Sequence, residues 1–364
     1  MNAQAKHGAD IMSRVEFAVA GQGQPVLQKL VREQIGHLTR ELLKASACAG
    51  REVKAVVVVG NTVMHHLFCG ISLEPLSHFP FEPVSPGLQV FRSAGLGWEL
   101  AGDPAVRFLP CLGSFVGSDI LAGLLATKLH ESEQLAALID LGTNGEIVVG
   151  NRERLLCAST AAGPAFEGAR ISMGMRAATG AISEVRAEDG KLRCHVLGNG
   201  EPRGICGSGL VDAVAAGLDL GWIKPSGRLA RGESLVLAEP VSLNQWDVRE
   251  LQLAKGAIAA GLRILLEQWG ATKEDLAQVY LAGAFGNYIN QASARRIGLM
   301  DFPTEKVKAA GNTALLGAKL ALFSLQQHEG AYPEILGKVK HVSLNEDERF
   351  QDRFVAEMGF PEAG

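Results

Sequence analysis

The sequence predicts an α/β protein in which one lobe is built twice. Two glycine-started helices carry this prediction, at residues 117–123 and 311–317, because leucine is the fifth residue and glycine the seventh in both. A short apolar strand ending in glycine precedes each helix, at 56–60 and at 279–283. A strand and helix that recur in the same order indicate duplication of one supersecondary unit. Convergent packing of small-residue helices is the alternative.

The duplication divides the chain into three expected parts. We expect a first lobe at residues 1–135, a second lobe at 136–330 and a C-terminal extension at 331–364. The length fits this division, because 364 residues correspond to two or three domains of ordinary size.

The other elements follow from periodicity and turn residues. Apolar residues at helical spacing predict a helix over 24–50, with Gly50 as its C-terminal cap. Strands at 136–141 and 146–149 flank Asn-Gly, a strong signal for a tight hairpin turn. A capping pattern at Asn244 opens a helix that runs to about residue 269.

Composition excludes several classes of function. The net charge is −4 and aromatic residues make up 6% of the chain, which argues against nucleic-acid binding. The six cysteines have no CxxC spacing, so we expect reduced thiols and neither a zinc site nor an iron–sulfur site in this chain. The N-terminus lacks an apolar signal region and no apolar run could span a membrane. A cytoplasmic location is expected.

The strongest candidate site is the hairpin from Asp140 to Glu146. Backbone N–H groups in a tight turn can bind an anion, and Gly142 lets an oxygen approach them closely. Thr143 and Asn144 add side-chain donors, followed by Gly145 and Glu146. Asp140 at the strand end could hold Mg²⁺, through water, because Mg²⁺ retains several water ligands. An ordinary hairpin with a polar turn is the alternative.

Three further segments could complete such a site. Small residues after a buried strand leave space for a flat ring or a sugar, at Gly283, Ala284, Phe285 and Gly286. Tight strand–helix packing is the alternative there. Gly207 and Ser208 open a helix, whose N-terminus favours anions.

Asp119, in the first of the repeated helices, could orient a water for phosphoryl transfer. A helix cap is the commoner use of aspartate at such a place. The sequence contains neither the P-loop nor the dinucleotide-binding fingerprint.

Together the hairpin, the segment at 281–286 and the two helices resemble the acetate and sugar kinase/Hsp70/actin superfamily of ATPases. The resemblance implies a duplicated RNase H-like fold in which the hairpin is the second phosphate segment and 281–286 the adenosine segment. Longer motifs are similar to those of the reductive activators of corrinoid proteins, in one order over nearly the whole chain: VVGNTVMH at 58–65, STAAGPAFEG at 159–168, MGMR at 173–176, GICGSGL at 204–210 and QLAKGAI at 252–258.

The resemblance implies that ATP and Mg²⁺ drive an uphill electron transfer to a Co(II) corrinoid protein of a methyltransferase system, yielding Co(I) in anaerobic metabolism. The donor in the family is a [2Fe-2S] ferredoxin-like domain, which is expected only on a missing N-terminal domain or on a partner protein. The first phosphate hairpin is also absent here, so the first lobe is expected to be truncated and the chain could be inactive alone. A homodimer is implied by resemblance only.

Two alternatives remain open at this point. One is a non-catalytic module that docks a corrinoid protein, and the other is a small-molecule kinase of the same superfamily.

Overall fold

The computed structural model describes residues 2–8, 10–286, 288–324 and 331–362. Its contacts divide the chain into two compact units. Unit 1 comprises Met1–His130 and Thr313–His341, and unit 2 comprises Glu131–Asn312 and Val342–Gly364. Each unit contains helices and a β-sheet, which confirms the predicted α/β class. The chain leaves unit 1 and returns to it, so residues 313–324 are grouped with the first unit. The expected boundaries of the two lobes and the C-terminal extension, at 1–135, 136–330 and 331–364, stay a prediction.

Unit 1 contains a three-stranded sheet of order β1-β3-β2. β1 pairs in parallel with β3, with Val56 opposite Val106, and β2 pairs with β3 in antiparallel orientation. An aromatic cluster packs on this sheet, where the Phe68 ring lies 5.4 Å from that of Phe108 and 5.9 Å from that of Trp98. The strands span Ala55–Val58 (β1), Gln89–Arg92 (β2) and Ala105–Phe108 (β3).

The helices of unit 1 include the predicted long one, α2. It covers Gly23–Ala45 and ends five residues before the expected end, because Ala47 takes a left-handed φ of 54°. Gly50, the expected cap, has a φ of 78° in the turn that follows. The remaining helices span Ile11–Val19 (α1), Thr62–Cys69 (α3), Ser118–Thr127 (α4), Thr313–Ser324 (α9) and Ala331–Lys338 (α10), and β14 is Val339–His341.

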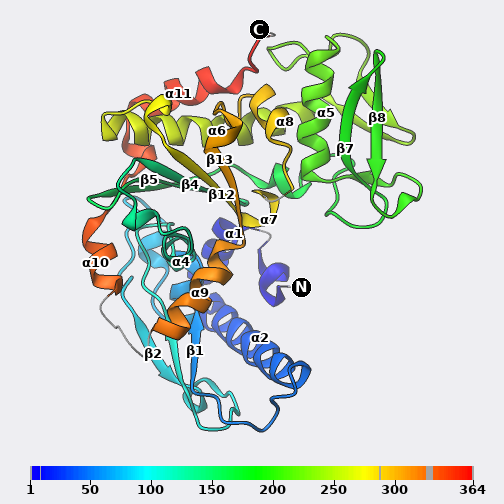
Figure 1. The fold of residues 1–364 in the computed structure, drawn as a ribbon. Helices are drawn as coiled ribbons and strands as arrows, with labels where there is room; N and C mark the ends of the chain where they lie inside the picture. Colours follow the sequence, from blue (N-terminus) through cyan, green and yellow to red (C-terminus); the bar gives the residue numbers. More distant parts are fainter. Residues whose placement is uncertain (1, 9, 287, 325–330, 363–364) are drawn as a thin grey trace. The chain divides into compact units, whose positions relative to one another are not determined.

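The two helices of the internal repeat, α4 and α9, pack against each other within unit 1 (Figure 1). A Cβ atom at Gly317 of α9 would lie 1.8 Å from the carbonyl oxygen of Ala122 in α4. The seventh-position glycine in α9 therefore allows two helix backbones to touch. A Cβ atom at Gly117, just before α4, would lie 2.2 Å from the carbonyl oxygen of Gly60.

Unit 2 is built on a sheet whose strands follow the order β13-β12-β4-β5-β6. β12 lies between β13 and β4 and is parallel to both, whereas β4, β5 and β6 form an antiparallel meander. The strands span Ala136–Leu141 (β4), Gly145–Gly150 (β5), Leu155–Thr160 (β6), Gln278–Ala282 (β12) and Val307–Gly311 (β13). Their inward side chains belong to one large apolar cluster.

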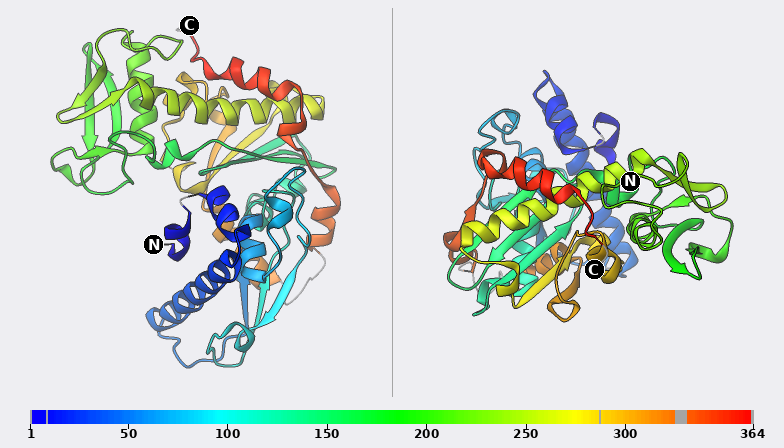
Figure 2. Two further views of the ribbon diagram at one scale, coloured as in Figure 1. Left: turned by 180° about the vertical axis from the view of Figure 1, so that it is seen from behind. Right: turned by 90° about the horizontal axis from the view of Figure 1, so that it is seen from above.

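Helix α6 (Gln245–Trp269) packs on β5 and β6, and α11 (Arg349–Met358) runs beside α6, as Figures 1 and 2 show from opposite sides. Asn244 caps α6 with the predicted capping box, and Gly270 ends the helix with a φ of 85°. The predicted bounds of this helix are confirmed.

A second sheet of unit 2, of order β8-β7-β9, packs on helix α5 (Figure 1). A separate ribbon is formed by β10 and β11. No helix in the described ranges is both long and apolar enough to cross a membrane. The remaining elements span Ala181–Glu188 (β7), Lys191–Val196 (β8), Gly204–Ile205 (β9), Gly207–Asp219 (α5), Ser234–Ala238 (β10), Val241–Asn244 (β11), Gly283–Gly286 (α7) and Gln291–Arg296 (α8).

Candidate functional site

The predicted hairpin is formed by β4 and β5, but its turn lies one residue earlier than the Asn-Gly signal indicates. Gly145 already pairs with Leu141 in the strand ladder, so the loop comprises residues 142–144. Within it the N–H of Gly142 donates to the carbonyl oxygen of Asn144 at 3.0 Å. This bond closes a three-residue turn.

Asp140 and Glu146 lie directly opposite each other on the two strands of the hairpin. Opposite residues of an antiparallel pair project from the same face of the sheet, and like charges in that arrangement repel. Ser159 of β6 donates from Oγ to Glu146 Oε1 at 3.4 Å. The hairpin therefore gathers two carboxyl groups and a hydroxyl group on one face, an oxygen-rich set of the kind that Mg²⁺ prefers.

Asp140 as a whole is half-buried, and burial of its carboxyl group raises the pKa to about 6. Its neighbour across the parallel pairing is Ala282, the last residue of β12. Gly283 follows with a φ of 84°, and a Cβ atom there would lie 2.7 Å from Asp140 Oδ1. The structure records no ion pair for Asp140 among the described residues. A cation beside this carboxylate would offset the cost of burying its charge.

The segment predicted to line an adenosine forms the short helix α7, which contains Gly283, Ala284, Phe285 and Gly286. Phe285 stacks on Phe166, with ring centroids 4.8 Å apart and an interplanar angle of 26°. One face of the Phe285 ring is therefore covered by another aromatic ring. Of the predicted residues, Gly283 lies against the hairpin.

A short 3-10 helix at Pro164–Glu167, here called η5, links the separate segments of the site. Thr143 of the hairpin donates from Oγ1 to Glu167 Oε1 at 2.5 Å. At the other end, a Cβ atom at Gly207 would lie 1.9 Å from the carbonyl oxygen of Phe166, so the start of α5 rests directly on η5. The hairpin, α7 and the start of α5 thus meet around one short segment of unit 2.

Phe166 and Glu167 were missed as site residues, although a signal for them exists in the sequence. They lie between Gly163 and Gly168, whose φ angles are 78° and 76°. Two glycines in left-handed conformations five residues apart indicate a strongly bent segment, which glycine accommodates without strain.

Ser208 and Asp119 lie in different surroundings. Ser208 is 8% exposed, and its hydroxyl group donates to the carbonyl oxygen of Ser183 at 2.9 Å. Asp119 belongs to unit 1, in the first turn of α4, where its Oδ1 accepts the N–H of Ile120 at 3.0 Å. The N-cap of α4 is Gly117, so Asp119 does not act as the cap.

The residues of unit 2 fit a nucleotide phosphate and its metal ion in two respects. The N–H groups of Thr143 and Asn144 lie in the loop, and no partner is recorded for either within the described residues. The buried carboxyl group of Asp140 lies at the end of the adjacent strand. The described residues contain no cluster of three or more histidine, cysteine, aspartate or glutamate side chains suited to hold a metal by themselves.

Comparison with known proteins covers the whole chain. A family model described as "RACo middle region" matches residues 1–132, and one described as "C-terminal domain of RACo the ASKHA domain" matches residues 134–364. A solved structure, "Reductive activator for corrinoid,iron-sulfur protein", superposes with a TM-score of 0.88 at 34% identity, over 99% of this chain and 61% of that one. These matches confirm the predicted duplicated ATPase fold.

Two curated relatives agree with this assignment. The "Corrinoid activation enzyme RamQ" of Eubacterium limosum is 34% identical over 386 residues, which cover 98% of this chain and 64% of that protein. The "[Co(II) methylated amine-specific corrinoid protein] reductase" of Methanosarcina barkeri is 28% identical over 386 residues, covering 97% of this chain and 70% of that protein. The chain thus spans less than two thirds of the length of the first relative and of the solved structure.

Proposed function

The chain belongs to the family of reductive activators of corrinoid proteins, and we propose that it is the ATP-binding portion of such an activator. The observation that carries the proposal is the meeting of hairpin, η5, α7 and the start of α5 beside the buried carboxyl group of Asp140. In the complete system, one electron from a donor outside residues 1–364 reduces Co(II) to Co(I) on a corrinoid protein. We assign the donor to a [2Fe-2S] ferredoxin-like domain or protein.

The residues have separate tasks in this proposal. The backbone N–H groups of Thr143 and Asn144 bind phosphate oxygens, because the N–H of Gly142 is already used within the loop. Asp140 would hold the magnesium ion that accompanies ATP, through water, and the metal would supply charge neutralisation of the phosphates. Glu167 holds Thr143 in one rotamer through the hydrogen bond at 2.5 Å. Gly283 and Phe285 belong to the wall beside the nucleoside.

ATP, when bound, would supply the binding energy for a shift in a conformational equilibrium, and its hydrolysis would reset that equilibrium. The role of Asp119 of unit 1 in orienting a water molecule stays a prediction from the sequence.

The test is calorimetric titration of the chain with Mg-ATP. We expect Asp140→Ala to weaken binding at least about tenfold, because a charge-assisted contact is lost. The matched control is Asp352→Ala, an exposed aspartate on α11 that should bind like the wild type. Equal affinities in wild type and Asp140→Ala would refute the assignment of the site.

Turnover separates the proposal from its two alternatives. With a corrinoid protein and a reduced [2Fe-2S] donor added, Co(I) should form only when ATP is present, as followed by the absorbance of the cobalt centre. Corrinoid binding with no ATP-dependent Co(I) would favour a non-catalytic docking module. Transfer of labelled phosphate to a metabolite, with no need for the corrinoid protein, would favour a kinase.

A further inference from the structure

A cavity of 620 Å³ lies within unit 2, away from the hairpin. One wall is a single face of α6 from Lys255 to Glu267, and the others are residues 271–274, the segment at 298–302 and the chain's last helical turn with residues 359–361. Lys255 and Glu267 are twelve positions apart in the helix, so this wall is about 18 Å long at 1.5 Å per residue. We call this cavity the α6 groove.

The α6 groove has an apolar stripe within a lining that also carries charged residues. Ala259, Leu262 and Leu266 contribute from α6, and Phe302 and Phe360 face them from the other segments. Phe302 and Phe360 are 4% and 5% exposed, so both rings are fixed within the fold. The lining also includes seven charged residues, of which Glu267, Glu274, Asp301 and Glu357 are acidic. The volume of the groove falls in the range of small-molecule sites.

One end of the groove holds a buried amine. Lys255 is 1% exposed, and its Nζ donates to the carbonyl oxygen of Gly359 at 2.5 Å. The same Nζ lies 5.7 Å from the centroid of the Phe360 ring. Burial lowers the pKa of this amine to about 8, and the charge of Glu357 acts in the opposite direction.

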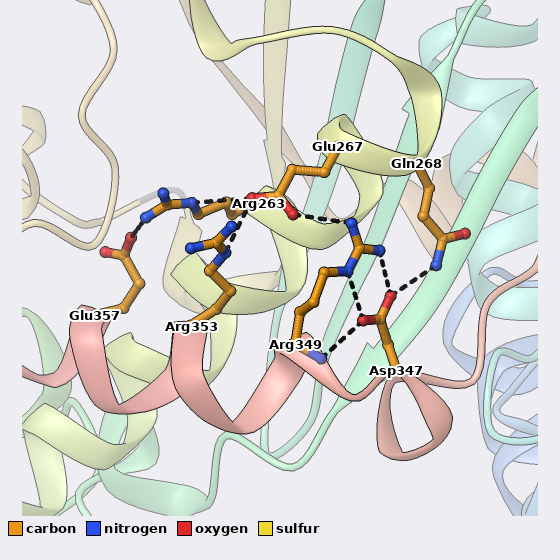
Figure 3. A network of polar contacts seen from close by, with 7 residues as sticks. All are labelled: Arg263, Glu267, Gln268, Asp347, Arg349, Arg353 and Glu357. Carbon is orange, nitrogen blue, oxygen red and sulfur yellow. Dashed lines mark hydrogen bonds and ion pairs between the residues drawn. The ribbon is translucent and has the colours of Figure 1, made fainter.

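The other two cations that line the groove have carboxylate partners. Arg263 pairs with Glu267 and with Glu357, each at 3.3 Å, and Figure 3 shows these contacts within the polar network between α6 and α11. Lys273 pairs with Asp301. Lys255 has no recorded ion pair among the described residues, and the carboxylate that influences it is held by Arg263. The amine at this end therefore feels the charge of Glu357 without a recorded ion pair of its own.

We propose that the α6 groove binds an amphipathic carboxylate, with its head group on Lys255 and its apolar chain along Leu262 and Leu266. A buried ammonium is unfavourable unless it is paired and hydrogen-bonded. A carboxylate supplies both, and a linear apolar chain matches the row of apolar side chains on α6 that leads away from the Lys255 amine. The site shares no residue with the proposed nucleotide site, so its test is independent of that proposal.

The test uses decanoate as the probe and decanol as its neutral analogue, both titrated calorimetrically into the intact chain. We expect decanoate to bind at least about tenfold more tightly than decanol, because only the acid makes a charge-assisted contact. Lys255→Met retains the apolar stem and should abolish that preference while leaving decanol binding unchanged. Lys319→Met, an exposed lysine of α9 in unit 1, is the matched control and should behave like the wild type.

A second variant keeps the test decisive if Lys255→Met does not fold, since Lys255 also fixes the C-terminal segment through Gly359. Ala259→Phe places a ring in the middle of the groove without altering the amine, and should abolish binding of both probes. Unchanged decanoate affinity in either variant, or absence of decanoate binding to the wild type, would overturn the proposal.

Discussion

The glycine that follows the first strand of the internal repeat has different neighbours in the two units. In unit 1, Gly60 exchanges hydrogen bonds with Ser118 at the start of α4: its N–H donates to Ser118 Oγ, and its carbonyl oxygen accepts the Ser118 N–H at 2.9 Å. A Cβ atom at Gly60 would meet only ordinary contacts, at 3.6 Å from Met64 and Phe108. In unit 2, Gly283 has a positive φ, and a Cβ atom there would collide with Asp140.

The strands before these glycines explain the difference. β12 is paired on both sides, by β13 and by β4, whereas β1 is paired with β3 alone in the described part of unit 1. The residues of β1 are all half-buried, while Val279, Leu281 and Ala282 of β12 are buried. The repeat places a glycine near the end of the strand in both units, two residues after β1 and directly after β12. Only Gly283 lies against a hairpin, so the requirement for glycine there comes from the hairpin.

The largest expected effect lies where the repeated helices cross. Gly317→Val would place its side chain on the carbonyl oxygen of Ala122, which a Cβ atom alone would approach to 1.8 Å. We expect a loss of more than about 3 kcal/mol in the free energy of unfolding of unit 1, since α4 and α9 would have to separate. Hydrogen exchange resolved by segment would show faster exchange in α4 and α9.

Gly95→Val is the matched control for that variant, because a Cβ atom at Gly95 meets nothing within 4 Å. Equal destabilisation by the two variants would mean that the helix crossing does not depend on the glycine.

The second prediction contrasts the two strand-end glycines directly. Gly283→Ala should lower stability by about 2 kcal/mol through backbone strain and contact with Asp140. It should also weaken Mg-ATP binding. Gly60→Ala should cost less than about 1 kcal/mol. Thermal unfolding of the two variants side by side measures the contrast, and comparable losses would contradict the role given to the hairpin.

The smallest expected effect on stability comes from ionisation of the buried carboxyl group of Asp140. Its pKa in the folded protein, about 6, is above the ordinary value of 3.8. Its contribution to stability is therefore complete below pH 3.8 and is lost as the pH rises through about 6. Asp140→Asn should accordingly be more stable than the wild type at pH 7.5, by about 1–2 kcal/mol in the absence of Mg²⁺, and the gain should vanish near pH 4.

Denaturant titrations at the two pH values, in the presence of a chelator, test this expectation. Asp352→Asn serves as the exposed control, with no change expected at either pH. A stability gain of Asp140→Asn that is the same at both pH values would point to a cause other than ionisation.

Much of this fold could be predicted from local sequence patterns. The α6 capping box, the β4–β5 hairpin and the paired strand–helix repeat all depend on residues close together in sequence, where spacing determines structure. Two contacts of the site could not be predicted in this way. Thr143 and Glu167 are 24 positions apart, and Phe166 and Phe285 are 119 positions apart, so neither contact has a local sequence signature. The turn at 142–144 was displaced by one residue because strand pairing, rather than the Asn-Gly preference, sets the register.

The return of the chain to unit 1 has a consequence for synthesis on the ribosome. Residues 131–312 form one continuous stretch of unit 2, which Val342–Gly364 completes, whereas unit 1 needs both Met1–His130 and Thr313–His341. The α4–α9 contact cannot form until residue 324 has left the exit tunnel, and it closes a loop whose entropic cost rises with its length. During translation, the apolar face of α4 that contacts α9 is therefore without its partner until α9 has been made. Most of unit 2 is available to fold before that point.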